Sequence, residues 1–240
     1  MLKFCLTVDC ERLIMFKQGN PEYNRFQRMK FFVNNLIKNF RYNKNGFELF
    51  YKEIKNNEFP CTFMLTGGLF KPLEDFNFVE WGYHTYNHLP LTLLSNERVE
   101  REVENIYDLK SITCPMWRIE EVKNPSRIFN ILKKQGYENT VYHGVNEGVK
   151  SVFKKSVRNP EVRFGIKCVH VSNYFEGNWS KKRIKNVKED ILKNLDKEGI
   201  YLLTTHDFTH KNTQNLRSIL KFIRKLEMNK KIKPINLSNS

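Results

Sequence analysis

The chain has 240 residues, of which 40% are hydrophobic and 13% aromatic, enough to bury one large core. Its formal net charge of +15 is compatible with a solvated lysine-rich surface, a nucleic-acid partner, or an anionic polymer or membrane face. We favour the solvated surface and expect no nucleic-acid partner, because the basic residues are scattered and no RNP, zinc-finger or basic-zipper pattern accompanies them.

The N-terminal segment, residues 1–9, contains a short apolar run that ends at a charge. It lacks the long apolar core and the small-residue cleavage site of a signal peptide. No apolar run in the sequence approaches the length of a membrane span. We therefore expect a cytoplasmic protein.

The cysteines are odd in number and widely spread, and they form no C-x-x-C pair of the kind found in zinc ribbons and redox sites. They are Cys5, Cys10, Cys61, Cys114 and Cys168. We expect reduced side chains, most of which serve as small hydrophobic residues within strands.

Runs of apolar, β-branched and aromatic residues predict seven strands. They cover residues 2–8, 61–66, 77–83, 112–118, 139–144, 166–171 and 200–205. Helical periodicity predicts helices between most of these strands. They cover 25–41 and 46–57, and apolar stripes mark three more at Val99–Leu109, Ile184–Leu195 and Leu216–Leu226. The polar tail from Asn229 onward is expected to fray.

Strands that alternate with helices along the whole chain predict parallel strands joined by right-handed crossovers. Seven such units suggest an α/β fold, a (β/α)7 TIM-like barrel, with an open doubly wound sheet as the alternative. No linker or break in composition interrupts the pattern, so we expect one domain over residues 1–240.

Polar residues follow the predicted strands at their carboxyl ends, where the loops of either architecture converge. In chain order they are Asp9 and Glu11, Gly67 and Gly68, His84 and His88, Arg118, and His206 with Asp207. The sequence therefore predicts that these candidates share one rim of the sheet.

His84 and His88 have the spacing of metal ligands, since one helical turn would bring two imidazoles four residues apart to the same side. The His-x-x-x-His pattern alone is also typical of two unrelated surface histidines. A carboxylate from another strand end would complete a site with open positions for water and substrate.

Three segments carry a family resemblance. They are Leu6-Thr7-Val8-Asp9, Cys61-Thr62-Phe63-Met64-Leu65-Thr66-Gly67 and His84-Thr85-Tyr86-Asn87-His88. In order and spacing they resemble the NodB-homology polysaccharide deacetylases, carbohydrate esterase family 4. The similarity continues through Arg118 to Leu203-Thr204-Thr205-His206-Asp207 and spans nearly the whole chain.

The resemblance implies a distorted (β/α) barrel with fewer than eight strands, which favours the barrel over the open sheet. It also implies an activity, metal-dependent deacetylation. By the same resemblance, Asp9 is the catalytic base, His84 and His88 are metal ligands, Arg118 orients the base and keeps it ionised, and His206 is the general acid.

The first motif of the family usually has a second aspartate, a metal ligand, directly after the base. This chain has Cys10 there, followed by Glu11. Some relatives place the ligand at the third position of the motif, so we favour Glu11. Cys10 remains the alternative, because its thiolate would also suit zinc.

The third motif usually reads Arg-x-Pro-x-Gly, and of this pattern the chain keeps only Arg118. Glu120 and Glu121 occupy the following positions, so Arg118 either acts at the site or pairs with one of them as a structural bridge. The fourth motif has no clear aspartate, although Asn139 and His143 lie in its region.

The remaining histidines and aromatic residues have simpler interpretations. We expect His143 and His170 to be structural histidines held by hydrogen bonds. The aromatic residues beside the motifs are candidates for stacking on a sugar ring or for the core. They are Trp81, Tyr86 and Trp117.

The predicted function is hydrolysis of an N-acetyl group on an N-acetylated sugar or glycan precursor, with a divalent metal, zinc or cobalt among the candidates. One alternative is hydrolysis of another C–N bond, in a formamide or a cyclic amide. A second is a relative that kept the barrel, lost catalysis and binds metal or nucleic acid, as Cys10 and the altered third motif suggest.

Overall fold

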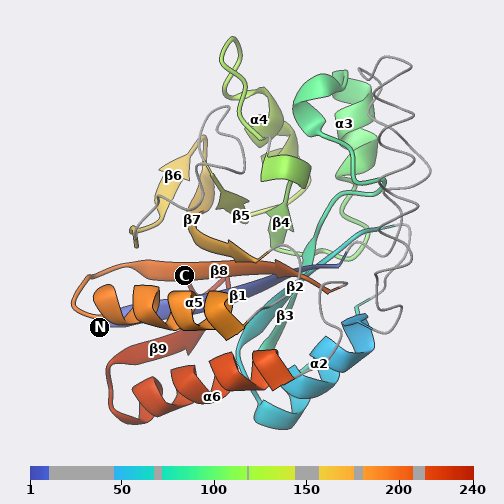
Figure 1. Ribbon diagram of the computed structural model, residues 1–240. Coiled ribbons are helices and arrows are strands. Elements are labelled where there is room, and N and C mark those ends of the chain that lie inside the picture. The colour runs from blue at the N-terminus through green and yellow to red at the C-terminus, as the bar shows by residue number, and fades with distance from the viewer. Residues whose placement is uncertain (11–45, 68–71, 118, 144–156, 176–180, 208–213) are drawn as a thin grey trace, which may run out of the picture.

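The computed structural model describes residues 1–10, 46–67, 72–117, 119–143, 157–175, 181–207 and 214–240. Seven parallel strands close into a barrel surrounded by helices, since β1 pairs with β8 on one side and with β2 on the other (Figure 1). In barrel order they are β2 (Cys61–Leu65), β3 (Val79–Tyr83), β4 (Ser111–Thr113), β5 (Asn139–Tyr142), β7 (Ile166–Phe175), β8 (Ile200–His206) and β1 (Leu2–Cys10). The (β/α)7 barrel and its seven strands are confirmed.

Two further strands were not predicted. β6 (Glu161–Arg163) runs antiparallel to β7, and β9 (Ile232–Ile235) runs parallel to the first half of β1. The expectation that the polar tail frays is therefore wrong. Leu237, after β9, is fully buried, and its backbone N–H donates to Thr62 Oγ1 at 2.9 Å, which ties the tail to the barrel.

Five α-helices lie in the described part of the chain. They are α2 (Gly46–Asn57), α3 (Asn96–Glu102), α4 (Arg127–Lys134), α5 (Lys181–Lys193) and α6 (Gln214–Met228). The helix expected over 46–57 is confirmed, α4 was not predicted, and the helix expected over 25–41 lies outside the described residues. α3 ends well before Leu109, because the Asn105 side chain bonds both the N–H and the carbonyl oxygen of Leu109 and folds that segment into a turn.

The helices cover the barrel in two groups. α2, α5 and α6 lie together on one side, and α3 and α4 lie on the other (Figure 1). Apolar residues three and four positions apart form the face of each helix that is buried. On α5 these are Ile184, Val187 and Ile191, and on α6 they include Leu216, Ile219 and Ile223.

Successive residues of β1 face alternately into the barrel and outward under the helices. Leu6 and Val8 belong to the large outer cluster, whereas Cys5 belongs to the cluster that fills the barrel. The Thr7 hydroxyl lies 2.9 Å from the Thr204 hydroxyl across the β1–β8 pair. Burial of both faces explains the nearly continuous apolar run of this strand. Asp9 lies on the inward face, at the carboxyl end of β1.

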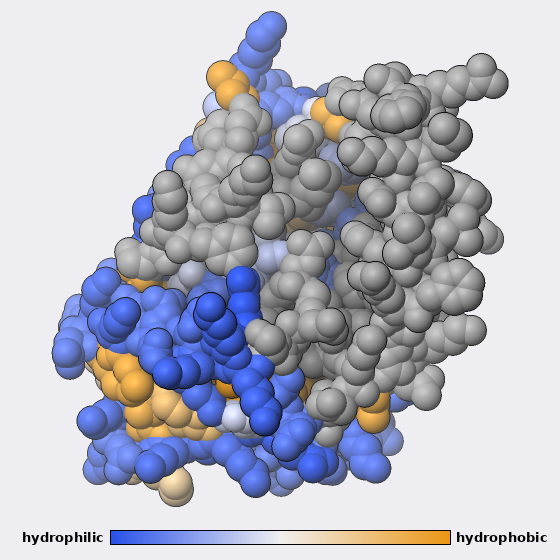
Figure 2. Space-filling view, viewed as in Figure 1, coloured by the Kyte–Doolittle hydropathy of each residue, from blue (hydrophilic) through white to orange (hydrophobic). Residues whose placement is uncertain are grey.

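The five cysteines are free and buried, as expected for reduced side chains. Burial raises the pKa of the Cys168 thiol to about 12. Hydrophilic residues dominate the surface over α5 and α6, with a narrow hydrophobic strip between them (Figure 2). No helix in the described ranges is long and apolar enough to cross a membrane.

Candidate active site

Asp9 and His206 are direct partners across two neighbouring strands. They lie at the carboxyl ends of β1 and β8, and their Cα atoms are paired in register. The two residues are only 3% and 7% exposed. Because Thr7 and Thr204 meet inside the barrel one level below, strand alternation places the predicted base and the predicted acid on the same inner face.

His84 and His88 lie together at the end of β3, with ring centroids 4.8 Å apart. The predicted closeness is found, but the predicted helical turn is not. The chain instead reverses through two residues in the left-handed region, with φ of 60° at Thr85 and 56° at His88. Such a φ is costly for a β-branched residue, and strained backbone of this kind gathers at functional sites.

The loop that carries the two histidines is anchored by Glu102, the last residue of α3, which is buried. Its carboxylate accepts hydrogen bonds from the backbone N–H and the side-chain amide of Asn87, each at 2.7 Å. The Glu102 carbonyl oxygen accepts another from the N–H of Tyr86 at 2.8 Å. Sequence reasoning missed Glu102, because nothing in its local pattern distinguishes it from a solvated glutamate on a helix.

The hydrogen bond of His84 fixes its tautomer. Its Nδ1 lies 2.8 Å from the carbonyl oxygen of Thr113, so Nδ1 must carry the proton and donate. In the neutral ring Nε2 then holds the lone pair, which is the arrangement of a metal-ligating histidine supported by a backbone carbonyl. The two imidazoles of His84 and His88 therefore fit the binding of a divalent ion.

The third ligand remains a prediction. Within the described residues, no three His, Cys, Asp or Glu side chains gather as a metal site. Glu11, the predicted carboxylate ligand, lies outside those residues.

Cys10, the alternative ligand, belongs to the outer cluster together with Leu6 and Val8, and it is fully buried. Its thiol donates to the Val8 carbonyl oxygen at 3.5 Å. Strand alternation places it on the opposite face of β1 from Asp9. The structure therefore argues against Cys10 as a ligand that shares a site with Asp9.

His206 contacts an aromatic group that the sequence analysis did not assemble. The Tyr174 hydroxyl lies 3.0 Å from His206 Nδ1 and 3.4 Å from Nε2. Trp117 packs edge-on against Tyr174 with ring centroids 5.0 Å apart, and the His143 ring also contacts Trp117, with centroids 5.2 Å apart. Tyr174 follows an irregularity in the β7–β8 register, so simple strand alternation could not place it at His206.

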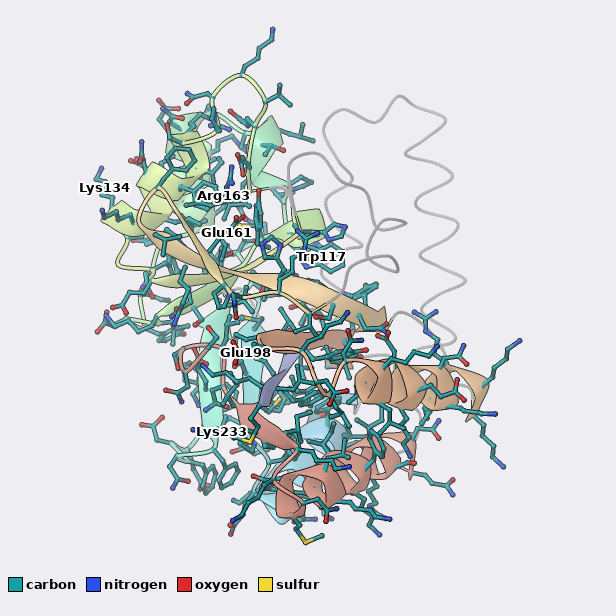
Figure 3. All side chains as sticks on the ribbon, turned by 90° about the vertical axis from the view of Figure 1, so that its left-hand side faces the viewer. Trp117, Lys134, Glu161, Arg163, Glu198 and Lys233 are labelled. Carbon is teal, nitrogen blue, oxygen red and sulfur yellow. The ribbon has the colours of Figure 1, made fainter. Side chains whose placement is uncertain are left out.

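Arg118 lies outside the described residues, but the two glutamates that follow it are described. Glu120 is buried and pairs with Arg163, and it accepts a hydrogen bond from the Tyr142 hydroxyl at 2.5 Å. Figure 3 shows Arg163 beside Glu161, to which it also pairs.

Glu121 has a basic partner as well. Arg127 Nε donates to both of its carboxylate oxygens at 3.0 Å. Each glutamate is thus engaged with an arginine that sequence reasoning did not propose.

Three other candidates are found away from the site. Asn139 begins β5, at the opposite end of the barrel from the rim, so it cannot supply the missing aspartate of the fourth motif. Trp81 packs in the outer cluster against Phe63, with ring centroids 5.5 Å apart, which is the core interpretation. His170 pairs with Glu161 at 3.4 Å, consistent with a structural role.

Tyr86 and Trp117 keep their place near the rim. Tyr86 is 44% exposed in the loop between His84 and His88, whereas Trp117 is buried against Tyr174 and His143. Of these two aromatic side chains, Tyr86 is the one exposed to solvent.

The chain is an α/β-barrel with acidic and basic groups at the carboxyl ends of its strands, which is where enzymes of this architecture have their active sites. No family model and no curated protein matches the sequence. Solved structures do match. A Mycobacterium smegmatis protein assigned to the polysaccharide deacetylases aligns over 99% of this chain and 88% of its own, with a TM-score of 0.66 and 14% identity.

The Bc1960 peptidoglycan N-acetylglucosamine deacetylase aligns over 99% of this chain and 86% of its own, with a TM-score of 0.50 and 14% identity. Puue allantoinase aligns over 97% and 86%, with a TM-score of 0.52 and 10% identity. The chain thus has the fold of the NodB-like polysaccharide deacetylases, which confirms the fold that the sequence resemblance implied.

Proposed function

We propose that the chain is a metal-dependent hydrolase that removes the acetyl group from an N-acetylated sugar or glycan precursor. The observation that carries this proposal is the presence of two pairs at one rim of a NodB-like barrel. His84 and His88 have ring centroids 4.8 Å apart, and Asp9 and His206 are partners in register. The first pair offers imidazole nitrogens to a cation, and the second offers a base and an acid.

In this proposal His84, His88 and Glu11 hold the ion, and zinc or cobalt suits two imidazoles with a carboxylate. Such an ion, when bound, makes an amide carbonyl more electrophilic and a water molecule more acidic. The hydrogen bond from His84 Nδ1 to Thr113 supports this assignment, because it fixes the ring and leaves Nε2 for the ligand role.

The proton transfers belong to the second pair. Asp9 accepts the proton of the attacking water, and His206, as the imidazolium, donates a proton to the departing nitrogen. Tyr174 supports His206 because its hydroxyl can accept from Nδ1–H, which is the closer of the two ring nitrogens. We also propose that Arg118 keeps Asp9 ionised.

Asp9 and His206 are both buried, so little water competes for the groups that move the proton. The amine and the acetate separate only after His206 has protonated the nitrogen, because an amide nitrogen leaves poorly without a proton. The two residues therefore have to act in sequence on one substrate, which their pairing across β1 and β8 favours.

The substrate class is supported by the likeness of the fold to the Bc1960 peptidoglycan N-acetylglucosamine deacetylase. A cytoplasmic enzyme would meet nucleotide- or lipid-linked precursors rather than finished polymer, so these are the first substrates to test. The fold shared with Puue allantoinase favours a second candidate, hydrolysis of the C–N bond of a cyclic amide or a formamide.

The test is product analysis with the full chain loaded with zinc or cobalt. We expect acetate and free amine from an N-acetylhexosamine panel, and loss of turnover with a chelator. Asp9→Asn should lower kcat by about 10²–10⁴-fold while the protein keeps its metal, as for loss of a general base. Formate or ureide products without acetate would favour the second candidate.

A third outcome would overturn both enzyme proposals. If protein prepared without chelator contains no divalent ion, releases no product and binds nucleic acid in a salt-sensitive manner, the chain is a binding relative that has lost catalysis.

A further inference from the structure

A cavity of about 530 Å³ opens at the amino-terminal end of the barrel, away from the rim that carries Asp9 and His206. Its walls include Lys3 near the start of β1, Lys233 near the start of β9, and Phe78 just before β3. Figure 3 shows Lys233 well apart from Trp117. The volume is within the usual range of small-molecule pockets, and the site proposed above does not use it.

Two cationic residues lie side by side in the wall of this cavity. Lys3 and Lys233 are paired in register on β1 and β9, so their backbones are only about 4.8 Å apart. Like charges that are directly opposite on neighbouring strands destabilise a sheet. No carboxylate of the described residues forms an ion pair with either ammonium group. Glu58 also lines the cavity, which leaves one excess positive charge.

Side-chain amides complete the lining. Asn77, Asn236 and Asn239 all contribute to the cavity walls. Asn236 is only 6% exposed, and its Oδ1 has no hydrogen-bond partner among the described residues. A buried acceptor without a partner destabilises the folded chain. Rotation of this amide toward the cavity would let the oxygen accept from a ligand hydroxyl.

We propose that this cavity binds a small phosphate-bearing polyol of the sugar phosphate class. The phosphate would lie between the Lys3 and Lys233 ammonium groups and remove their repulsion, since a compact ammonium group is a regular phosphate binder. The asparagine amides and Glu58 would bind the hydroxyl groups. A ligand here stabilises the folded chain without contacting the residues at the rim, so the proposal does not depend on the proposed function.

The experiment is thermal unfolding of the full chain with increasing inorganic phosphate or glucosamine 6-phosphate, at constant ionic strength maintained with chloride. A ligand that binds only the folded state raises Tm in proportion to the logarithm of its concentration above Kd. We expect this logarithmic rise for both probes, with the rise beginning at a lower concentration of the sugar phosphate because it binds more tightly.

The variants locate the site. Lys3→Gln and Lys233→Gln should each weaken binding at least tenfold, while Lys225→Gln, an exposed lysine of α6 that does not line the cavity, should leave it unchanged. Asn236→Ala should reduce the preference for the sugar phosphate over phosphate. Asp9→Asn should bind as the wild type does, which separates this result from any failure of the proposed catalytic site.

Equal Tm shifts in the wild type and in both cavity lysine variants would overturn the proposal, because the effect would then be a general action of phosphate on the surface. Equal affinity for inorganic phosphate and glucosamine 6-phosphate would overturn the assignment of the hydroxyl groups to the asparagines and Glu58.

Discussion

The Tyr174 hydroxyl lies 3.0 Å from Nδ1 of His206, so a side chain of β7 holds the proposed general acid at the end of β8. The Tyr174 ring is in turn held by Trp117, edge-on with ring centroids 5.0 Å apart. The hydrogen bond with Tyr174 fixes the orientation of the His206 ring. The sequence has no clear aspartate of the fourth motif. Tyr174 is therefore a positioning residue in the proposed reaction.

Replacing Tyr174 with Phe should lower kcat by about tenfold, because a charge-assisted hydrogen bond of roughly 1.5–3 kcal/mol is lost from the imidazolium. The alkaline limb of the pH–rate profile should move to lower pH, since the imidazolium loses an acceptor and gives up its proton more easily. Steady-state kinetics across pH measures both effects.

Tyr137→Phe is the matched control, because the Tyr137 hydroxyl is buried and has no hydrogen-bond partner among the described residues. Its profile should coincide with that of the wild type. If Tyr174→Phe lowered kcat with no movement of the alkaline limb, Tyr174 would have only a packing role.

Glu102 should control metal affinity without touching the ion. Its carboxylate holds Asn87 through two hydrogen bonds of 2.7 Å, and Asn87 directly precedes His88, a proposed metal ligand. Glu102→Gln replaces one acceptor by a donor, so one of these bonds is lost and the loop loosens. We expect metal affinity to fall roughly tenfold, in line with the loss of a group that orients a ligand.

Competition with a chromophoric chelator measures that affinity. Glu100→Gln is the control, because Glu100 is on the same helix but forms only an exposed pair with Lys134. Unchanged metal affinity in Glu102→Gln, with the fold intact by circular dichroism, would remove Glu102 from the support of the site.

The strands of the barrel could be predicted because residues such as Leu6 and Val8 are buried on one face while Cys5 is buried on the other, which gives a continuous apolar run. β9 could not be predicted. Its apolar residues are few and the flanking segment is rich in lysine, so its pairing with β1 is decided by tertiary contacts rather than by its own sequence.

The candidate site likewise has residues that could be predicted from the sequence and features that could not. Asp9, His84 and His206 were predicted because strand ends converge in parallel barrels and because the motifs resemble a family. The left-handed backbone at Thr85 and the irregularity beside Tyr174 depend on long-range packing, so neither periodicity nor propensity reveals them. Local rules fail where contacts distant in the chain fix an unusual conformation.

Glu120 should contribute to stability rather than to catalysis. Its carboxylate is buried and is bound by Arg163 and by the Tyr142 hydroxyl. Glu120→Gln removes the buried carboxylate of the two that pair with Arg163 and leaves only the more exposed Glu161. Because the Arg163 side chain is 30% exposed, we expect a loss of roughly 2–3 kcal/mol in the free energy of unfolding, below the range for fully buried pairs.

Urea denaturation measures that loss, and Glu74→Gln, which removes an exposed pair with Lys55, should change the stability by less than about 1 kcal/mol. Equal, small effects of the two substitutions would show that the Glu120 pair is no stronger than a surface pair.

Two substitutions can decide whether Cys10 or Glu11, the second and third positions of the first motif, supplies the non-histidine ligand. Cys10 is fully buried in the outer cluster, on the face of β1 opposite to Asp9. Cys10→Ala should therefore keep the full metal content and cost only about 1 kcal/mol of stability, for a small cavity. Glu11→Gln should lose the metal, because a neutral amide is a far weaker ligand than a carboxylate.

Metal analysis of the two purified variants, each reconstituted with one equivalent of zinc, gives the answer directly. Asp9→Asn is the reference, because the base is proposed to act on water and not to hold the ion. Loss of zinc from Cys10→Ala but not from Glu11→Gln would require the Cys10 side chain to lie on the same face of β1 as Asp9. It would reverse the assignment that the packing of Cys10 with Leu6 and Val8 supports.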